Sequence, residues 1–188
     1  GYLLDTSDPE KSIPGSTIIS GIGFISGVRC MVVVDDSGIM AGTLTSAGGY
    51  RVRRCEEIAL QQKLPFVHLV ESAGGDLINY TVEGFSHGGE LFGNLAKLSK
   101  AGIPVISILH GSSTAGGAYM PGLSDYVIAV RNNGRAFLAG PPLLKAAGVT
   151  DDQKAEIKAI AAADRPALRS LHGQLRAANQ TLTDALFI

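Results

Sequence analysis

The stretch Pro-Phe-Val-His-Leu-Val-Glu-Ser-Ala-Gly-Gly-Asp, residues 65–76, decides the expected fold. Phe66–Val70 is a short apolar run between a proline and a glycine pair, a pattern that predicts a buried strand. The same order recurs at residues 104–119, Pro-Val-Ile-Ser-Ile-Leu-His-Gly-Ser-Ser-Thr-Ala-Gly-Gly-Ala-Tyr. There the strand Pro104–Leu109 runs into the glycine-rich residues 111–117, which open a short helix.

Amphipathic helices are expected around these two strands. Residues 50–63 place Cys55, Ile58 and Ala59 on one face, and the charged positions 53, 54, 56 and 57 are expected to face solvent. Residues 81–100 place Phe85, Phe92, Leu95 and Leu98 at near-helical spacing, with Gly102 as the C-terminal cap.

Further strands are expected towards both ends of this region. Residues 31–34 and 126–130 are apolar runs that predict strands, and residues 39–44 predict a weaker one. Gly21–Gly27 resembles a dinucleotide fingerprint, but its third glycine is displaced and a strand follows it, so we interpret it as part of a β-hairpin. Strands alternating with helices predict an α/β fold around a largely parallel sheet.

The two glycine-rich loops, residues 72–75 and 111–117, are the expected ligand site. Ligands of open α/β sheets bind beyond the carboxyl ends of the strands, and both loops lie at such ends. Gly116 and Gly117 could present backbone N–H groups to an anion or to a carbonyl oxygen that gains charge. Small residues needed only for tight helix–strand packing explain the pair equally well.

The composition excludes several classes of function. The 188 residues are 45% hydrophobic and 18% charged with a net charge of −1, which argues against a nucleic-acid partner, a membrane partner and disorder. Two cysteines at positions 30 and 55 are too few for a disulfide framework and predict no metal site. The start, Gly1–Asp5, has no basic region of a signal peptide, so a cytoplasmic protein is expected.

One alternative chemistry arises from residues 111–115, Gly-Ser-Ser-Thr-Ala, which approximate the nucleophile elbow of serine hydrolases with Ala115 in place of the last glycine. Ser112 or Ser113 would be the nucleophile. A hydrolase also needs a histidine base and an orienting acid, and none follows the serine in suitable order except His172.

Several segments together resemble the carboxyltransferase β subunit of biotin-dependent acyl-CoA carboxylases, in particular the propionyl-, methylcrotonoyl- and geranyl-CoA carboxylase group. The resemblance runs from about residue 15 to 147, and its segments are 55–60, 64–77, 101–106, 111–125 and 136–145. It implies a crotonase-like (ClpP/crotonase) fold of ββα units in residues 1–148. A protease of the Clp type has a related fold, but no His–Asp pair follows the serine here.

The resemblance also implies a reaction. The family transfers a carboxyl group from carboxybiotin to the α- or γ-carbon of an acyl-CoA through an enolate. By position, the backbone amides of Gly116 and Gly117 would hold the enolate oxygen. The residues expected to line the substrate pocket are Ser72, Ala73, Gly74, Gly75, Thr114, Ala115, Ala118 and Tyr119. The expected partners are acyl-CoA, a biotin carboxylase and biotin carrier subunit with biotin on the carrier domain, and further copies in a homo-oligomer. In a eukaryote the location would be the mitochondrial matrix.

The chain departs from the family in two ways. It lacks the second crotonase-like half that binds biotin, so the isolated chain is expected to be inactive. Residues 149–188 instead predict an additional α-helical C-terminal segment of uncertain origin: two helices separated at Pro166, the first capped by Thr150 and Gln153. A non-catalytic fragment or scaffold with a crotonase-like core is therefore the second hypothesis.

Overall fold

A five-stranded mixed sheet organises the part of the chain up to residue 140. The computed structural model describes residues 16–79, 81–140, 148, 150–153 and scattered positions between 155 and 177. The first two strands form an antiparallel hairpin that turns at Ser26 and Gly27, and the remaining neighbours pair in parallel. In spatial order the strands are β1 (Ile18–Ile25), β2 (Val28–Asp35), β3 (Phe66–Val70), β4 (Val105–Leu109) and β6 (Tyr126–Ala129). The expected α/β class and hairpin are confirmed.

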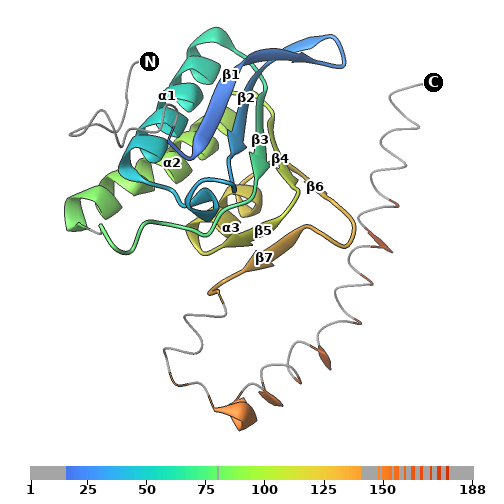
Figure 1. Ribbon diagram of the computed structural model, residues 1–188. Coiled ribbons are helices and arrows are strands. Elements are labelled where there is room, and N and C mark those ends of the chain that lie inside the picture. Colours follow the sequence, from blue (N-terminus) through green and yellow to red (C-terminus); the bar gives the residue numbers. More distant parts are fainter. Residues whose placement is uncertain are drawn as a thin grey trace. The chain divides into compact units, whose positions relative to one another are not determined.

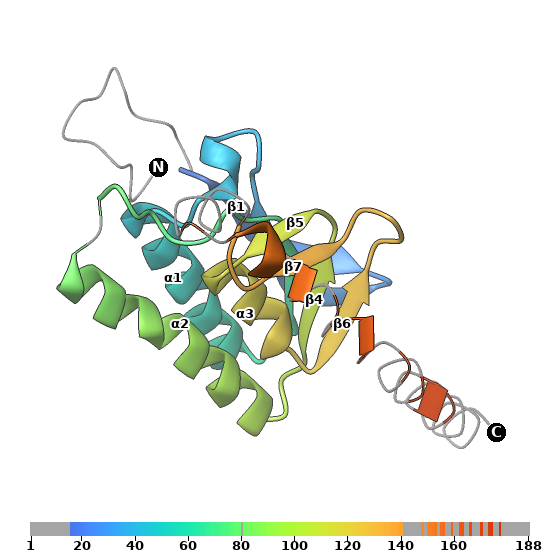
Figure 2. The same cartoon turned by 90° about the horizontal axis from the view of Figure 1, so that it is seen from below.

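Two long helices, α1 (Ser46–Gln62) and α2 (Val82–Lys100), lie side by side over one face of the sheet (Figures 1 and 2). Each begins at a threonine whose side chain accepts a backbone N–H: Thr45 from Gly48, and Thr81 from Gly84. These caps satisfy amides that have no intrahelical partner. The cap at Thr45 starts α1 four residues before the predicted start at residue 50. Gly102 has a φ of +72°, as expected of a residue that ends a helix.

The core fills the space between these helices and the sheet. Met31, Val33, Phe66 and Val105 on the strands pack in one cluster with side chains of α1 and α2. The members on α1 and α2 are Val52, Cys55, Ala59, Leu91, Leu95 and Leu98. Full burial of one such side chain contributes about 1.5–3 kcal/mol, so this layer fixes the strands that carry the glycine-rich loops. Phe92 packs at the cluster's edge, whereas Phe85, predicted on the same stripe, is 71% exposed near the helix start.

The prediction of a strand at residues 39–44 is wrong. The chain forms a short 3₁₀ helix there, η1 (Met40–Gly42), and Met40, Ala41 and Gly42 all have positive φ angles. The neighbouring loop holds this turn: the Ala73 amide donates to the Ala41 carbonyl and the Ser72 hydroxyl donates to the Gly42 carbonyl. Gly42 has no side chain, which leaves room for the Glu71 carbonyl. Only Leu44 keeps strand-like pairing, as an isolated bridge to Gly75.

Glu56 also differs from expectation, because it is buried rather than solvent-facing. Its side chain lies between α1 and α2, where the Asn94 amide donates to Oε2 at 3.2 Å and Oε1 has no partner among the described residues. Burial raises the pKa of Glu56 to about 8, although the Asn94 hydrogen bond and the charge of Arg53 oppose the shift. The periodicity missed this position because α2 covers more of α1 than the apolar stripe alone indicates.

A second, two-stranded sheet was not predicted. β5 (Ser112–Thr114) pairs in parallel with β7 (Arg135–Phe137), so part of the expected glycine-rich loop is a strand. The short helix α3 (Gly116–Gly122) follows β5 and packs on β3, β4 and β5 (Figure 2).

The chain divides into two compact units, Gly1–Gly140 and Pro141–Ile188. In the second unit, Thr150 and Gln153 form the predicted reciprocal cap. The Thr150 amide donates to Gln153 Oε1 with an N···O distance of 2.9 Å, and the Gln153 amide donates to Thr150 Oγ1 at 3.3 Å. Pro166, expected to separate two helices, is itself helical, but most residues that define those helices lie outside the described part. The domain boundary at residue 148 stays a prediction. Within the described part of the chain, no helix is long and apolar enough to span a membrane.

Candidate functional site

The two glycine-rich loops meet at the carboxyl ends of β3 and β4. The Ser72 amide donates to the Ser112 carbonyl at 3.1 Å, and the Thr114 amide donates to the Ser72 carbonyl at 2.9 Å. These bonds continue the sheet pairing beyond the ends of the two strands. The convergence that the strand order suggested is therefore present in the fold.

Gly117 lies against the first of these loops with no room for a side chain. A Cβ at this position would lie 2.8 Å from the Ser72 Cβ, closer than real Cβ atoms approach another atom. At Gly74, with a φ of +96°, a Cβ would lie 3.0 Å from the Thr114 carbonyl oxygen. Both glycines therefore allow the two loops to approach each other. For Gly117 this is close to the packing role that the sequence left open beside its ligand role.

The start of α3 leaves two amides without partners. Ala115 precedes the helix with a φ of 48° and a ψ of −116°, and its carbonyl accepts from the amides of Ala118 and Tyr119. The amides of Gly116 and Gly117 come before these bonds and have no acceptor among the described residues. The first N–H groups of a helix are available to a ligand for this reason.

The loop after β3 leaves one such amide. Ser72, Ala73 and Gly74 donate to Ser112, to Ala41 and to the Ser72 hydroxyl, respectively, and Asp76 donates to Leu44. Gly75 is therefore the residue of segment 72–76 whose amide has no acceptor in the described chain, and it is exposed. Of the substrate residues predicted here, it is the one with a free donor.

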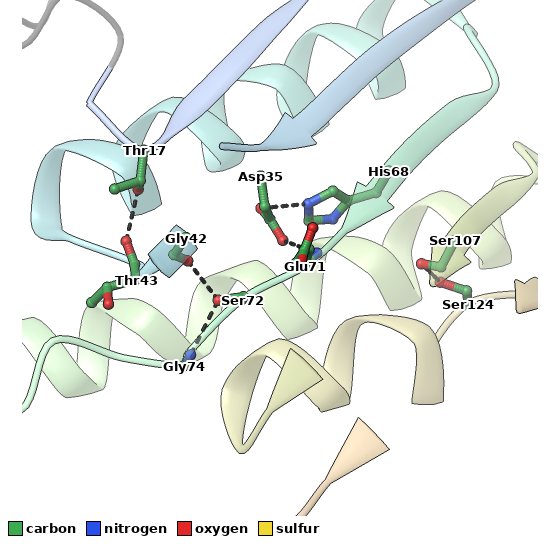
Figure 3. A network of polar contacts seen from close by, with 10 residues as sticks. All are labelled: Thr17, Asp35, Gly42, Thr43, His68, Glu71, Ser72, Gly74, Ser107 and Ser124. Atoms are coloured by element: carbon green, nitrogen blue, oxygen red, sulfur yellow. Dashed lines mark hydrogen bonds and ion pairs between the residues drawn. The ribbon is translucent and has the colours of Figure 1, made fainter. Parts of the chain in front are cut away.

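The Ser72 side chain serves the loop itself. Figure 3 shows its hydroxyl between two backbone groups: it donates to the Gly42 carbonyl at 2.7 Å and accepts from the Gly74 amide at 3.1 Å. The residue is 5% exposed. Ser72 therefore shapes the loop, and its hydroxyl is not available to a ligand.

An apolar pocket of about 470 Å³ opens beside α3. Three predicted residues line it: Ala115, Ala118 and Tyr119, whose ring contacts that of Phe92 at a centroid distance of 5.5 Å. The residues that sequence reasoning did not assign to the site are Gly122, Leu123, Ala136, Phe137 and Leu138. All five lie in segments 111–125 and 136–145 of the resemblance, which marked these residues without giving them a role.

A serine nucleophile does not fit this arrangement. Ser113 is fully buried, and its hydroxyl has no partner among the described residues. The strained turn before the helix, where hydrolases place the serine, is occupied by Ala115, which has no reactive atom. In the described part of the chain, no group of three or more His, Cys, Asp or Glu side chains could hold a metal ion.

Comparisons with known proteins agree on one family. The carboxyl transferase domain matches residues 4–163 and so extends into the segment predicted as a helical tail. A probable biotin-dependent acyl-coenzyme A carboxylase beta2 subunit of Mycobacterium tuberculosis is 44% identical over 71% of this chain. The mitochondrial methylcrotonoyl-CoA carboxylase beta chain of Arabidopsis thaliana is 42% identical over 73% of it. The match covers 25% and 24% of these two relatives, so the chain spans about a quarter of their length.

Solved structures give the same result. The geranyl-CoA carboxylase beta subunit of P. aeruginosa superposes on 68% of this chain and 25% of its own with a TM-score of 0.64 and 52% identity. A transcarboxylase 12S hexamer with methylmalonyl-coenzyme A bound superposes on 72% of this chain and 25% of its own with a TM-score of 0.62 and 28% identity. These neighbours are carboxyltransferases, which supports the crotonase-like fold expected for the first unit. On sequence and structure alike, the chain belongs to the carboxyl transferase domain family.

Proposed function

We propose that this chain is the acyl-CoA-binding part of the carboxyltransferase component of a biotin-dependent acyl-CoA carboxylase. The observation that carries the proposal is the group of three unpartnered backbone amides, Gly75, Gly116 and Gly117, on two converging loops. The two loops follow strands that end at the same edge of the sheet, and an apolar pocket lined by Ala115 and Ala118 lies beside the segment that carries Gly116 and Gly117.

The amides would stabilise the negative charge that develops when the substrate is deprotonated. Removal of a proton from the α-carbon of an acyl thioester, or from the γ-carbon of an unsaturated one, moves negative charge onto the thioester oxygen. Backbone N–H donors stabilise that oxygen without reorganising, and loss of one such donor lowers the rate by about 10²–10³-fold. Biotin, carried by a partner domain, supplies the carboxyl group and takes up the proton.

The pocket beside α3 suits the acyl portion of the substrate. Ala118, Tyr119, Phe137 and Leu138 give it apolar walls, which favour a hydrocarbon chain over a charged group. The expected partners remain a biotin carboxylase and biotin carrier subunit and further copies of the chain. The transcarboxylase hexamer among its structural neighbours supports assembly, and the name of the mitochondrial Arabidopsis relative supports a matrix location in a eukaryote; a cytoplasmic location otherwise remains a proposal.

Ligand binding by the 188-residue chain tests the substrate. Titration calorimetry with 3-methylcrotonyl-CoA, geranyl-CoA and methylmalonyl-CoA is expected to show binding of at least one thioester. Free coenzyme A and the free acids are expected to bind more weakly, because they lack either the acyl group or the thioester oxygen. The 188 residues alone are expected to carboxylate none of them, since they span about a quarter of the length of these relatives.

The alternatives predict other results. A non-catalytic scaffold would bind none of the thioesters, and that outcome would overturn the proposal. A serine hydrolase would be labelled at Ser112 or Ser113 by a fluorophosphonate, whereas a carboxyltransferase would not. The buried Ser113 hydroxyl and the alanine at position 115 favour the unlabelled result.

A further inference from the structure

A buried acid–histidine pair lies beneath the loop that carries Gly75. Asp35 is the last residue of β2 and His68 is central in β3; their side chains meet at 3.0 Å between Asp35 Oδ1 and His68 Nε2. Asp35 is 6% exposed and His68 3%. Polar groups in such a place cost free energy unless they are well bonded, and apolar residues of similar size are often as stable. A buried pair of this kind is therefore expected to do more than stabilise the fold.

Asp35 has a second contact, and this contact reaches the loop. Its Oδ2 accepts the backbone amide of Glu71 at 3.1 Å, as Figure 3 shows. Glu71 is the first residue after β3, where β2 has already turned away at Asp36. The carboxylate thus supplies the hydrogen bond that a further strand residue would otherwise give, and His68 holds the carboxylate in place.

The residues that follow Glu71 in the loop are also held by hydrogen bonds. The next amides, at Ser72, Ala73 and Gly74, are each fixed by a bond, and Gly75 follows with its amide free. The Glu71 bond is the first of the successive anchors that fix this loop, and we expect its loss to loosen the segment that ends at Gly75. Catalytic groups tolerate little displacement: a misplacement of about 1 Å can lower a rate by about 10²-fold.

We propose that Asp35 and His68 are positioning residues that hold the loop 71–75 so that the Gly75 amide faces the reacting thioester. The proposal rests on the proposed function for its catalytic consequence, but the anchoring of the loop can be tested without it. Both side chains are buried, so they are expected to act through the loop and not by contact with the substrate.

The test uses isosteric replacement. Asp35→Leu keeps the shape of the side chain but removes both acceptors. Asp35→Asn keeps an oxygen for the Glu71 amide and an N–H group for His68, so it is expected to restore the anchor. Ser107→Ala is the matched control: Ser107 lies opposite His68 in the register, is 1% exposed, and bonds Ser124 at 2.6 Å without contacting the loop.

Amide hydrogen exchange in the 188-residue chain is the first measurement. Asp35→Leu is expected to speed exchange at Glu71, Ser72 and Gly74 by at least about tenfold relative to the core strands. Asp35→Asn and Ser107→Ala are expected to leave the loop protected. Unchanged loop protection in Asp35→Leu would overturn the proposal, as would equal loss in Ser107→Ala. If Asp35→Leu does not fold, Glu71→Pro takes its place in the comparison, because proline at position 71 removes the N–H group that donates to Asp35.

Turnover by the complete carboxylase that contains this chain is the second measurement. Asp35→Leu is expected to lower kcat by about 10–100-fold with a smaller change in the KM for acyl-CoA, and Asp35→Asn to restore most of kcat. Ser107→Ala is expected to lower Tm but keep kcat. Full kcat in Asp35→Leu would overturn the catalytic consequence. Absence of turnover in the wild-type enzyme would instead contradict the proposed function, and the exchange result would still decide the anchoring.

Discussion

At Gly117 an added methyl group would have no space, because its carbon would lie 2.8 Å from the Ser72 Cβ. Gly117→Ala is therefore expected to push the two loops apart and to weaken binding of the acyl-CoA thioester by up to about tenfold, because the displaced amide loses a hydrogen bond worth about 0.5–1.5 kcal/mol. Titration calorimetry on the chain measures this. Gly93→Ala in α2 is the control, since nothing lies within 4 Å of the added carbon. Equal thioester affinity in the two variants would contradict the assignment of the loop.

Residue patterns revealed this site only in part. The glycine pairs at 74–75 and 116–117 could be predicted because paired glycines near the end of an apolar strand are typical of a tight turn or of a backbone that closely approaches a ligand. The roles of Asp35 and Ser72 could not be predicted. Asp35 contacts His68 only through the pairing of β2 with β3, and the Ser72 hydroxyl meets Gly42 only because residues 40–42 turn back toward the loop.

Among the elements, α2 is unusual in carrying four glycines within 19 residues. At Gly88 an added Cβ meets nothing within 4 Å, so Gly88→Ala is expected to raise the free energy of unfolding by about 0.5–1 kcal/mol. At Gly84 the added Cβ would lie 2.9 Å from the Thr81 Oγ1 that caps the helix, so Gly84→Ala is expected to lose this gain. Urea unfolding of both variants checks the pair, and equal stabilisation would show that the cap contributes little.

The elements that the sequence predicts best are those with strong local signals. β3 and β4 are short apolar runs bounded by proline and small residues, and α2 has a threonine cap at one end and Gly102 at the other. β5 and β7 have three residues each and no apolar pattern, and they become strands only by pairing with each other. Long-range pairing of this kind leaves no local trace in the sequence.

For the whole molecule, the layer of α1 and α2 over the sheet combines an apolar core with one buried acid. Arg53 links the same two helices through an ion pair with Glu90 at 2.6 Å near the surface, whereas Glu56 lies inside. Because the pKa of Glu56 rises to about 8, the folded chain keeps this carboxyl protonated at pH values where the unfolded chain ionises it.

The burial of Glu56 is therefore expected to make the stability of the folded chain fall as the pH rises. The contribution of Glu56 is fully present below its ordinary pKa of 4.5 and is lost as the pH rises to about 8. Each unit of pKa difference between the folded and the unfolded chain corresponds to about 1.4 kcal/mol in the free energy of unfolding. Glu56→Gln stays neutral and can still accept from Asn94, so it is expected to flatten this fall and to exceed the wild type in stability near pH 8. Urea unfolding between pH 4.5 and 8 measures the difference, with the exposed neighbour Glu57→Gln as control. If Glu56→Gln loses stability with pH as steeply as the wild type, the helix layer does not hold a protonated acid in solution.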